Sequence, residues 1–182
     1  GKVAGKFGTF TLNSDGKYSY KANEGLNLNE GVTETDSFTV LVTDAHGATT
    51  QQVLKVNLTG ANDAPTVKFD SGVDHTGNTV QASITEDTHT SLTGNAKTFF
   101  EDDEGDSNLT FSAKSVSSNT AGMVVRGEYG VLVVKPDGSY SYVLNNSDSK
   151  VQGLDSKTPN ITETFTIIAT DKHGASNEVT LK

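Results

Sequence analysis

The sequence of 182 residues contains no cysteine, no tryptophan, one methionine and only 3 prolines. The lack of cysteine excludes a disulfide framework, so stability has to come from an apolar core, from bound metal, or from both. No apolar run approaches the roughly 20 residues that a membrane-spanning helix requires, so we expect no membrane insertion. The N-terminus has no signal-peptide pattern, and any export signal is expected outside these residues.

Positive charge is also scarce. The chain has 14 basic and 23 acidic side chains, for a formal net charge of -9. Proteins that bind nucleic acid need a basic surface, so nucleic acid is not an expected partner. An acidic composition suits cation binding, although it also serves solubility alone. Many short alternating runs punctuated by Gly, Asn and Asp predict an all-β sandwich.

An internal repeat is the most informative feature of the sequence. GKFGTFTLNSDGKYSY from Gly5 matches GEYGVLVVKPDGSYSY from Gly127, and TDSFTVLVTDAHGAT from Thr35 matches TETFTIIATDKHGAS from Thr162. The Asp-Gly pairs predict tight hairpin turns, since glycine accepts the positive φ that such turns demand. The Tyr-x-Tyr pairs predict ring packing on one strand face. The repeat therefore consists of two successive strand pairs.

Between the repeats lies the string Gly-Ala-Asn-Asp-Ala-Pro, residues 60–65. Proline favours an extended residue before it, so this boundary is expected to be stiff. The predicted parts are the C-terminal half of a sandwich repeat at 1–61, a linker at 62–65 and a complete repeat at 66–182. Three explanations of the incomplete first repeat stay open. The chain is cut inside a repeat, an inserted domain splits the repeat, or the first part is a smaller self-sufficient fold.

The strings DGKYSY, TVLVTDAHGA and TGANDAP, in their order and recurrence, resemble the VCBS and cadherin-like repeats of bacterial RTX adhesins. The resemblance covers nearly the whole chain, apart from stretches around 70–80 and 145–160. It implies tandem immunoglobulin-like or cadherin-like Greek-key sandwiches with an incomplete first unit. It also implies type I secretion, an extracellular bacterial surface, a role in adhesion and biofilm formation, and a monomer whose partners are neighbouring repeats of the same polypeptide.

Oxygen donors are expected to gather at the junction between the two repeats. Calcium takes six to eight oxygen ligands from carboxylates, carbonyls and water. Several carboxylates close together repel one another unless a cation lies among them. The loop FFEDDEGDSN alternates acids around Gly105, although a solvated acidic turn is the simpler interpretation of that loop taken alone. The predicted Ca²⁺ ligands are Glu34, Asp36, Asn62, Asp63, Asp102, Glu104, Asp106 and Asp171.

Three further acids are predicted to bind calcium weakly or not at all. Glu86 and Glu163 are expected at the far end of the second repeat, and Asp44 at the far end of the first. Each lacks the neighbouring linker that would complete a site. His46 and His173 have no second histidine or cysteine at ligand spacing, so we expect both to be exposed.

These observations predict a calcium-dependent structural or extender repeat that stiffens a domain junction and projects ligand-binding modules. The alternative is a calcium-dependent module that itself binds a sugar or peptide, or a split domain that carries one. The long polar stretch 145–158 is the feature that favours this alternative, although a solvated insertion explains it more simply. No nucleophile elbow, HExxH helix or nucleotide loop is present, so no enzyme is predicted.

Overall fold

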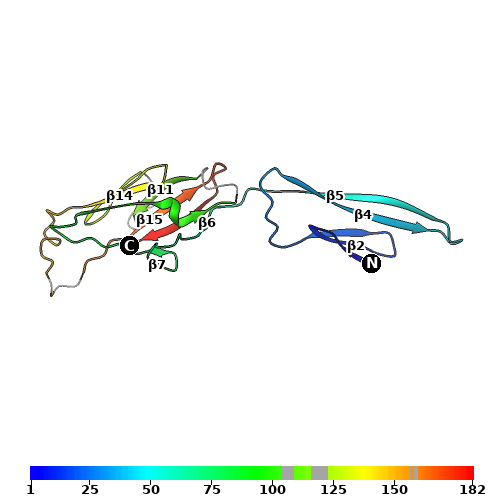
Figure 1. The fold of residues 1–182 in the computed structure, drawn as a ribbon, viewed down its shortest axis with the longest axis horizontal. Helices are drawn as coiled ribbons and strands as arrows, with labels where there is room; N and C mark the ends of the chain where they lie inside the picture. The colour runs from blue at the N-terminus through cyan, green and yellow to red at the C-terminus, as the bar shows by residue number, and fades with distance from the viewer. Residues whose placement is uncertain (104–108, 116–122, 156, 158–159) are drawn as a thin grey trace. The chain divides into compact units, whose positions relative to one another are not determined.

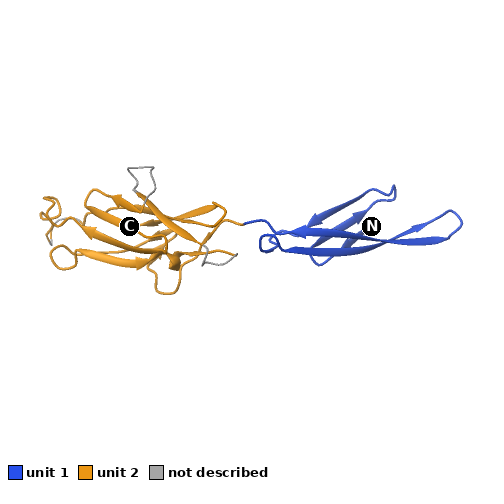
Figure 2. Cartoon of the chain, turned by 90° about the horizontal axis from the view of Figure 1, so that it is seen from above, with its two compact units in different colours: residues 1–62 blue, residues 63–182 orange. Residues whose placement is uncertain are grey.

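The computed structural model describes residues 1–103, 109–115, 123–155, 157 and 160–182. They form two compact units, Gly1–Asn62 and Asp63–Lys182 (Figures 1 and 2). Among the described residues the only helix is the short 3₁₀ turn η1 (Ala96–Phe99), and no helix there could cross a membrane. The predicted all-β, immunoglobulin-like architecture is confirmed.

The first unit consists of two small antiparallel sheets. One sheet has the order β1 (Lys2–Ala4), β2 (Gly8–Leu12), β3 (Tyr18–Ala22), and the other pairs β4 (Thr33–Thr43) with β5 (Thr49–Thr59). Gly16, with a φ of 83°, turns the chain between β2 and β3, as the Asp-Gly pair predicts. The rings of Phe10 and Phe38 reach across from the two sheets and stack with centroids 4.9 Å apart. The buried core of this unit is therefore small and aromatic.

The second unit is a fuller sandwich. One sheet has the order β11-β15-β16-β8-β7 and the other the order β12-β13-β14-β9, while β6 pairs with β10. Leu132 of one sheet and Ile167 of the other are both fully buried between the two layers. The strands are β6 (Thr66–Val67), β7 (His75–Thr76), β8 (Thr79–Val80), β9 (Ser91–Asn95), β10 (Phe100–Glu101), β11 (Thr110–Ser115), β12 (Val124–Arg126), β13 (Gly130–Val134), β14 (Ser139–Leu144), β15 (Phe165–Thr170) and β16 (Ser176–Leu181).

Strands β1–β5 correspond one by one to β12–β16. The register is the same in both units, because Val3 pairs opposite Phe10 as Val125 pairs opposite Leu132. The short strand β1 was not among the strands that the sequence predicts for the first unit. The first unit, all of whose residues are described, has no counterparts of β6–β11. It therefore holds only the C-terminal strands of the sandwich.

Candidate functional site

One end of the second unit, which we call the leading end, is where the chain passes through Pro65 into β6. Glu101 pairs with Thr66 there, so Asp102 follows directly beside the start of the unit. The side chain of Asn177 donates a 3.0 Å hydrogen bond to the carbonyl of Pro65. Because β16 and β15 pair around the turn at Asp171, that turn lies at the same end. Two of the predicted ligands, Asp102 and Asp171, are thus brought to one end of the second unit.

Both of these carboxylates are largely removed from solvent. Asp102 is 9% exposed and Asp171 is 7% exposed. Oδ1 of Asp171 accepts hydrogen bonds from the backbone N–H of His173 at 2.8 Å and of Ala175 at 2.9 Å. Burying a carboxylate is costly unless hydrogen bonds or a cation compensate the charge. The leading end therefore carries buried negative charge from two different loops.

The first unit contains the same turn in an exposed setting. Oδ1 of Asp44 accepts from the backbone N–H of His46 at 2.8 Å and of Ala48 at 2.9 Å. Asp44 is nevertheless exposed, whereas Asp171 is buried. His46 and His173 are both exposed, as the sequence predicts. The local turn is thus identical in the two units, and only its surroundings differ.

The remaining predicted ligands are more scattered. Asp63 is exposed, while Glu34 and Asn62 are half-buried in the first unit. Glu104 and Asp106 lie outside the described residues. Within the part of the chain that the structure describes, no three acidic or histidine side chains come close enough together to hold a metal ion. The predicted calcium site therefore stays a prediction.

Asp36 has a different setting from that expected for a junction ligand. It is buried in the first unit, and its Oδ1 accepts a 2.8 Å hydrogen bond from the backbone N–H of Lys6. Its Oδ2 accepts from the N–H of Phe7 at 3.1 Å and from the hydroxyl of Tyr20 at 2.7 Å. We call this arrangement the first-unit latch. It ties β4 to the β1–β2 turn and to β3, which belong to the opposite sheet.

Glu163 forms the corresponding second-unit latch. Oε1 accepts a 2.9 Å hydrogen bond from the backbone N–H of Tyr129, and Oε2 accepts a 2.6 Å bond from the hydroxyl of Tyr142. The acid is aspartate in one unit and glutamate in the other, yet two of the donors are equivalent: the N–H of Phe7 corresponds to that of Tyr129, and the hydroxyl of Tyr20 to that of Tyr142. In the sequence, both acids stand two residues before a phenylalanine. Each unit also repeats a Gly-x-aromatic-Gly segment and a Tyr-x-Tyr pair. These three repeated features together are the sequence signal for the latch, and the prediction of calcium ligands did not use them.

Glycine makes room for each latch. A methyl group on Gly5 would overlap the carboxylate of Asp36, and one on Gly127 would overlap that of Glu163. Gly8 similarly leaves space for the ring of Tyr20. A side chain at these positions would displace the acid or the ring, because protein interiors leave little free space.

The electrostatics of the first-unit latch favour a charged acid and a neutral phenol. Burial would raise the pKa of Asp36, but hydrogen bonds from the Tyr20 hydroxyl and from backbone N–H groups outweigh it and lower the pKa below its ordinary value. Burial, together with the hydrogen bond and the negative charge of Asp36, raises the pKa of Tyr20 to about 12. Burial and Glu163 likewise raise the pKa of Tyr142. The first-unit latch is therefore a stable carboxylate–phenol pair at neutral pH.

The opposite end of the second unit, the trailing end, has a hollow of about 670 Å³. Its lining includes Ile84, Glu86, Leu154 and Asp155. The described part of the polar stretch, residues 145–155, is anchored to the unit, because Val151 is fully buried. Glu86 and Glu163 both line this hollow, at the end where the sequence places them.

Side chains of this stretch also hold the turn at Glu86 and Asp87. The side chain of Asn146 donates a 2.8 Å hydrogen bond to Asp87, and Gln152 donates to the same carboxylate at 3.4 Å. These two side-chain hydrogen bonds lower the pKa of Asp87. The anchored stretch and the Glu86–Asp87 turn thus form one wall of the hollow.

Comparison with known proteins bears on the first unit. Residues 2–57 match the family described as a bacterial Ig domain. Among curated proteins, none matches the chain. Bacterial Ig-like domains are commonly extracellular and are typically structural, non-enzymatic modules. The match does not separate VCBS or cadherin-like repeats of RTX adhesins from other bacterial Ig domains. Residues 2–57 are therefore similar to a bacterial Ig domain, and this similarity suggests a surface-repeat role.

Proposed function

We propose that the chain is a calcium-dependent structural repeat of a bacterial cell-surface adhesin, with its calcium site at the leading end of the second unit. The bacterial Ig-like match and the latched sandwich architecture support a structural role. Because the chain has no cysteine, no disulfide can stabilise the repeat, which leaves a packed core, bound metal, or both. In the adhesin, such repeats extend and position ligand-binding modules for attachment and biofilm formation.

The observation that carries the calcium proposal is the burial of Asp102 and Asp171 at one end of the second unit. The available donors are all hard oxygens, as calcium prefers. The further ligands that we propose are Asp63 and two acids that follow Asp102 in the sequence, Glu104 and Asp106. When bound, the ion supplies positive charge that offsets the repulsion between the carboxylates. Asp102 and Asp171 then hold two separate loops against the same charge.

The first-unit residues have a smaller part in this proposal. Both oxygens of Asp36 already accept hydrogen bonds within the latch. We therefore assign Asp36 a structural role and leave Glu34 and Asn62 as predicted ligands. Stiffening of the domain junction by calcium follows only if these first-unit residues take part. Calcium titrations of Glu34→Gln and Asn62→Ala chains test that extension separately.

Thermal unfolding with calcium and with chelator tests the proposal. A ligand that binds only the folded state stabilises it by about 2.7 kcal/mol at a concentration 100 times its dissociation constant. We expect calcium to raise the melting midpoint of the second unit, and Asp171→Asn to remove most of that rise. Asp44→Asn, in the identical but exposed turn of the first unit, is the matched control and should leave the calcium-induced rise unchanged. Equal midpoints in calcium and chelator would contradict the calcium site.

A second candidate function is binding of a sugar or peptide in the trailing-end hollow. Its volume of about 670 Å³ and its mixed lining, with Ile84 and Leu154 beside Glu86 and Asp155, favour a small amphipathic ligand. A glycan array and a peptide library, each screened with and without calcium, test it. Binding that survives Glu86→Gln and Leu154→Asp would place the ligand elsewhere.

A further inference from the structure

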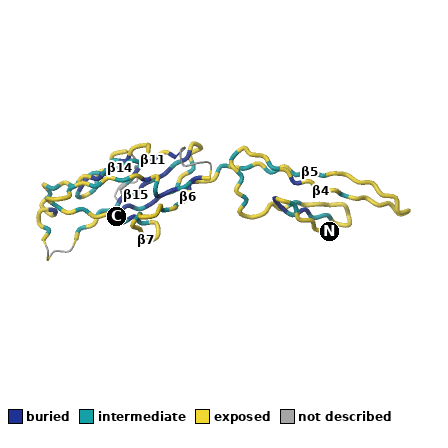
Figure 3. The backbone as a smooth tube through the Cα atoms, in the orientation of Figure 1, coloured by how far each residue is buried: buried dark blue, intermediate teal, exposed yellow. Residues whose placement is uncertain are grey.

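Apolar side chains of the first unit are exposed where their counterparts in the second unit are buried. Val3 is 55% exposed, whereas Val125 is 6% exposed. Val42 is 58% exposed, whereas Ala169 is fully buried. Figure 3 shows the same contrast along the chain, since the tube of β4 is mostly exposed and that of β15 alternates between buried and intermediate. The first unit therefore has an apolar face that lacks a cover.

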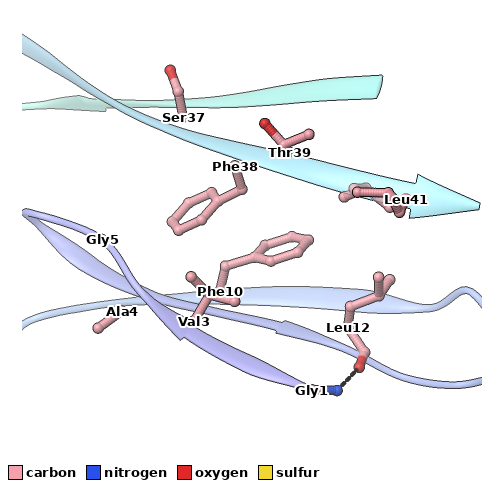
Figure 4. A pocket seen from close by; sticks show the side chains of 11 residues that line it. Gly1, Val3, Ala4, Gly5, Phe10, Leu12, Ser37, Phe38, Thr39 and Leu41 are labelled. Carbon is pink, nitrogen blue, oxygen red and sulfur yellow. Dashed lines mark hydrogen bonds between the residues drawn. The ribbon is translucent and has the colours of Figure 1, made fainter. Parts of the chain in front are cut away.

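This uncovered face surrounds a hollow of about 290 Å³ between the two sheets of the first unit. Its lining comes from β1, β2 and β4 and includes Val3, Leu12 and Leu41. Figure 4 shows Phe10 and Phe38 pointing toward each other from the two sheets, at the inner side of the hollow. The hollow is thus an extension of the small aromatic core toward solvent.

In the second unit, β11 occupies the corresponding place. It pairs along β15, the counterpart of β4, and lies against β12 and β13, the counterparts of β1 and β2. Phe111 of this strand is 3% exposed and Ala113 is fully buried. The two side chains complete the core at the point where the first unit is open.

The edge of β4 is also unprotected against strand pairing. In the first unit, all of which is described, β4 pairs with β5 alone. Natural sheet edges are usually guarded by charged side chains, proline or a bulge. The run from Ser37 to Thr43, SFTVLVT, contains neither a charge nor a proline, and Leu41 and Val42 are exposed on it. This composition suits an edge that is covered by another strand.

We propose that the first unit binds an extended segment of the same polypeptide that corresponds to β11, and that this segment completes the sandwich by pairing with β4. In the second unit Phe111 lies opposite Ala169, and Ala113 lies opposite Ile167. The same register places two inward-facing apolar residues of the bound segment opposite Val42 and Val40. The repeat itself supports the same-polypeptide source, because β11 precedes β12 in the second unit.

A graft onto the full chain tests the proposal. Residues 109–123 are copied in front of Lys2, so that a second copy of β11 precedes β1 as the original precedes β12. We expect amide hydrogen exchange along the free edge of β4 to slow by at least about tenfold, and the melting midpoint of the first unit to rise. The measurement is made in chelator, so its outcome does not depend on the proposed calcium site.

Two variants make the result specific. The control graft carries Phe111→Asp and Ala113→Asp in the copied segment only, and it should give neither protection nor a higher midpoint. Val42→Asp in the receiving strand should leave the ungrafted chain unchanged, because Val42 is exposed there. In the grafted chain the same substitution should abolish the gain.

Three outcomes would overturn the proposal. One is equal stabilisation by the intact and the control graft, and another is a grafted β4 that exchanges as fast as the ungrafted strand. The third is a dimer of the ungrafted chain in light scattering that Val42→Asp dissociates, because a second copy would then cover the face.

Discussion

The hydroxyl of Tyr20 donates a 2.7 Å hydrogen bond to Oδ2 of Asp36, and Tyr142 donates one of 2.6 Å to Oε2 of Glu163. The two units thus join their sheets by the same carboxylate–phenol pair, although the acid differs in length. The pair crosses from one sheet to the other, so it fixes how the sheets pack as well as how each strand runs. Hydrogen bonds to a charged acceptor are stronger than those between neutral groups.

Tyr20→Phe tests the phenol of the first-unit latch at alkaline pH. The pKa of Tyr20 is raised from 10.0 to about 12 in the folded protein, so the neutral phenol stabilises the fold. This contribution is complete below the unfolded value of 10.0 and is lost as the pH rises through about 12. We expect the wild-type first unit to lose stability between these values and Tyr20→Phe to lose less. Urea unfolding across this pH range measures the unfolding free energy of both proteins. An equal loss with pH in wild type and Tyr20→Phe would contradict the prediction.

Asp36→Asn tests the acid of the same latch at low pH. The folded pKa of Asp36 lies below its ordinary value of 3.8, so the charged form stabilises the fold. That stability is present above 3.8 and is lost as the pH falls through the lowered value. We expect Asp36→Asn to be less stable at neutral pH and to depend less on pH in the acidic range. Glu24→Gln, an exposed acid of the same unit, is the control and should retain the acid dependence.

Gly127→Ala tests the close approach in the second-unit latch. The added methyl overlaps the carboxylate of Glu163, which has to move away from Tyr129 and Tyr142. Overpacking of this kind costs about 1–3 kcal/mol of unfolding free energy. Gly1→Ala is the control, because no atom lies within 4 Å of its added methyl. Denaturant midpoints measure both, and a neutral Gly127→Ala would show that the latch tolerates displacement.

Leu132→Ala tests the core of the second unit. Leu132 is fully buried between the two sheets, so its truncation leaves a cavity as well as lost apolar contact. We expect a loss of about 2–5 kcal/mol of unfolding free energy. Val124→Ala, at a side chain that is 60% exposed, should change it by no more than about 0.5 kcal/mol. Comparable losses for the two variants would mean that the sheets do not pack as described.

The amino-acid sequence alone predicted the repeat, its hairpin turns and most strands of the first unit. Alternation of apolar residues and the Asp-Gly pairs depend on local backbone geometry, so they predicted the hairpins around Gly16 and Gly138 correctly. The repeated segments also indicated that the first unit holds only the last strands of a sandwich. β1 escaped prediction because three residues are too few to show a period.

The setting of each acid, in contrast, depends on how the sheets pack. The sequence predicts both Asp36 and Asp171 as calcium ligands. In the structure Asp36 accepts hydrogen bonds from the opposite sheet, whereas Asp171 is buried in the turn at the leading end. Asp44 and Asp171 even share the same turn, yet Asp44 is exposed and Asp171 is buried. The hydrogen-bond partners of a carboxylate and its access to water depend on strands that are distant in sequence. For this reason the repeat predicts the strands, whereas the packing of the sheets decides the role of each carboxylate.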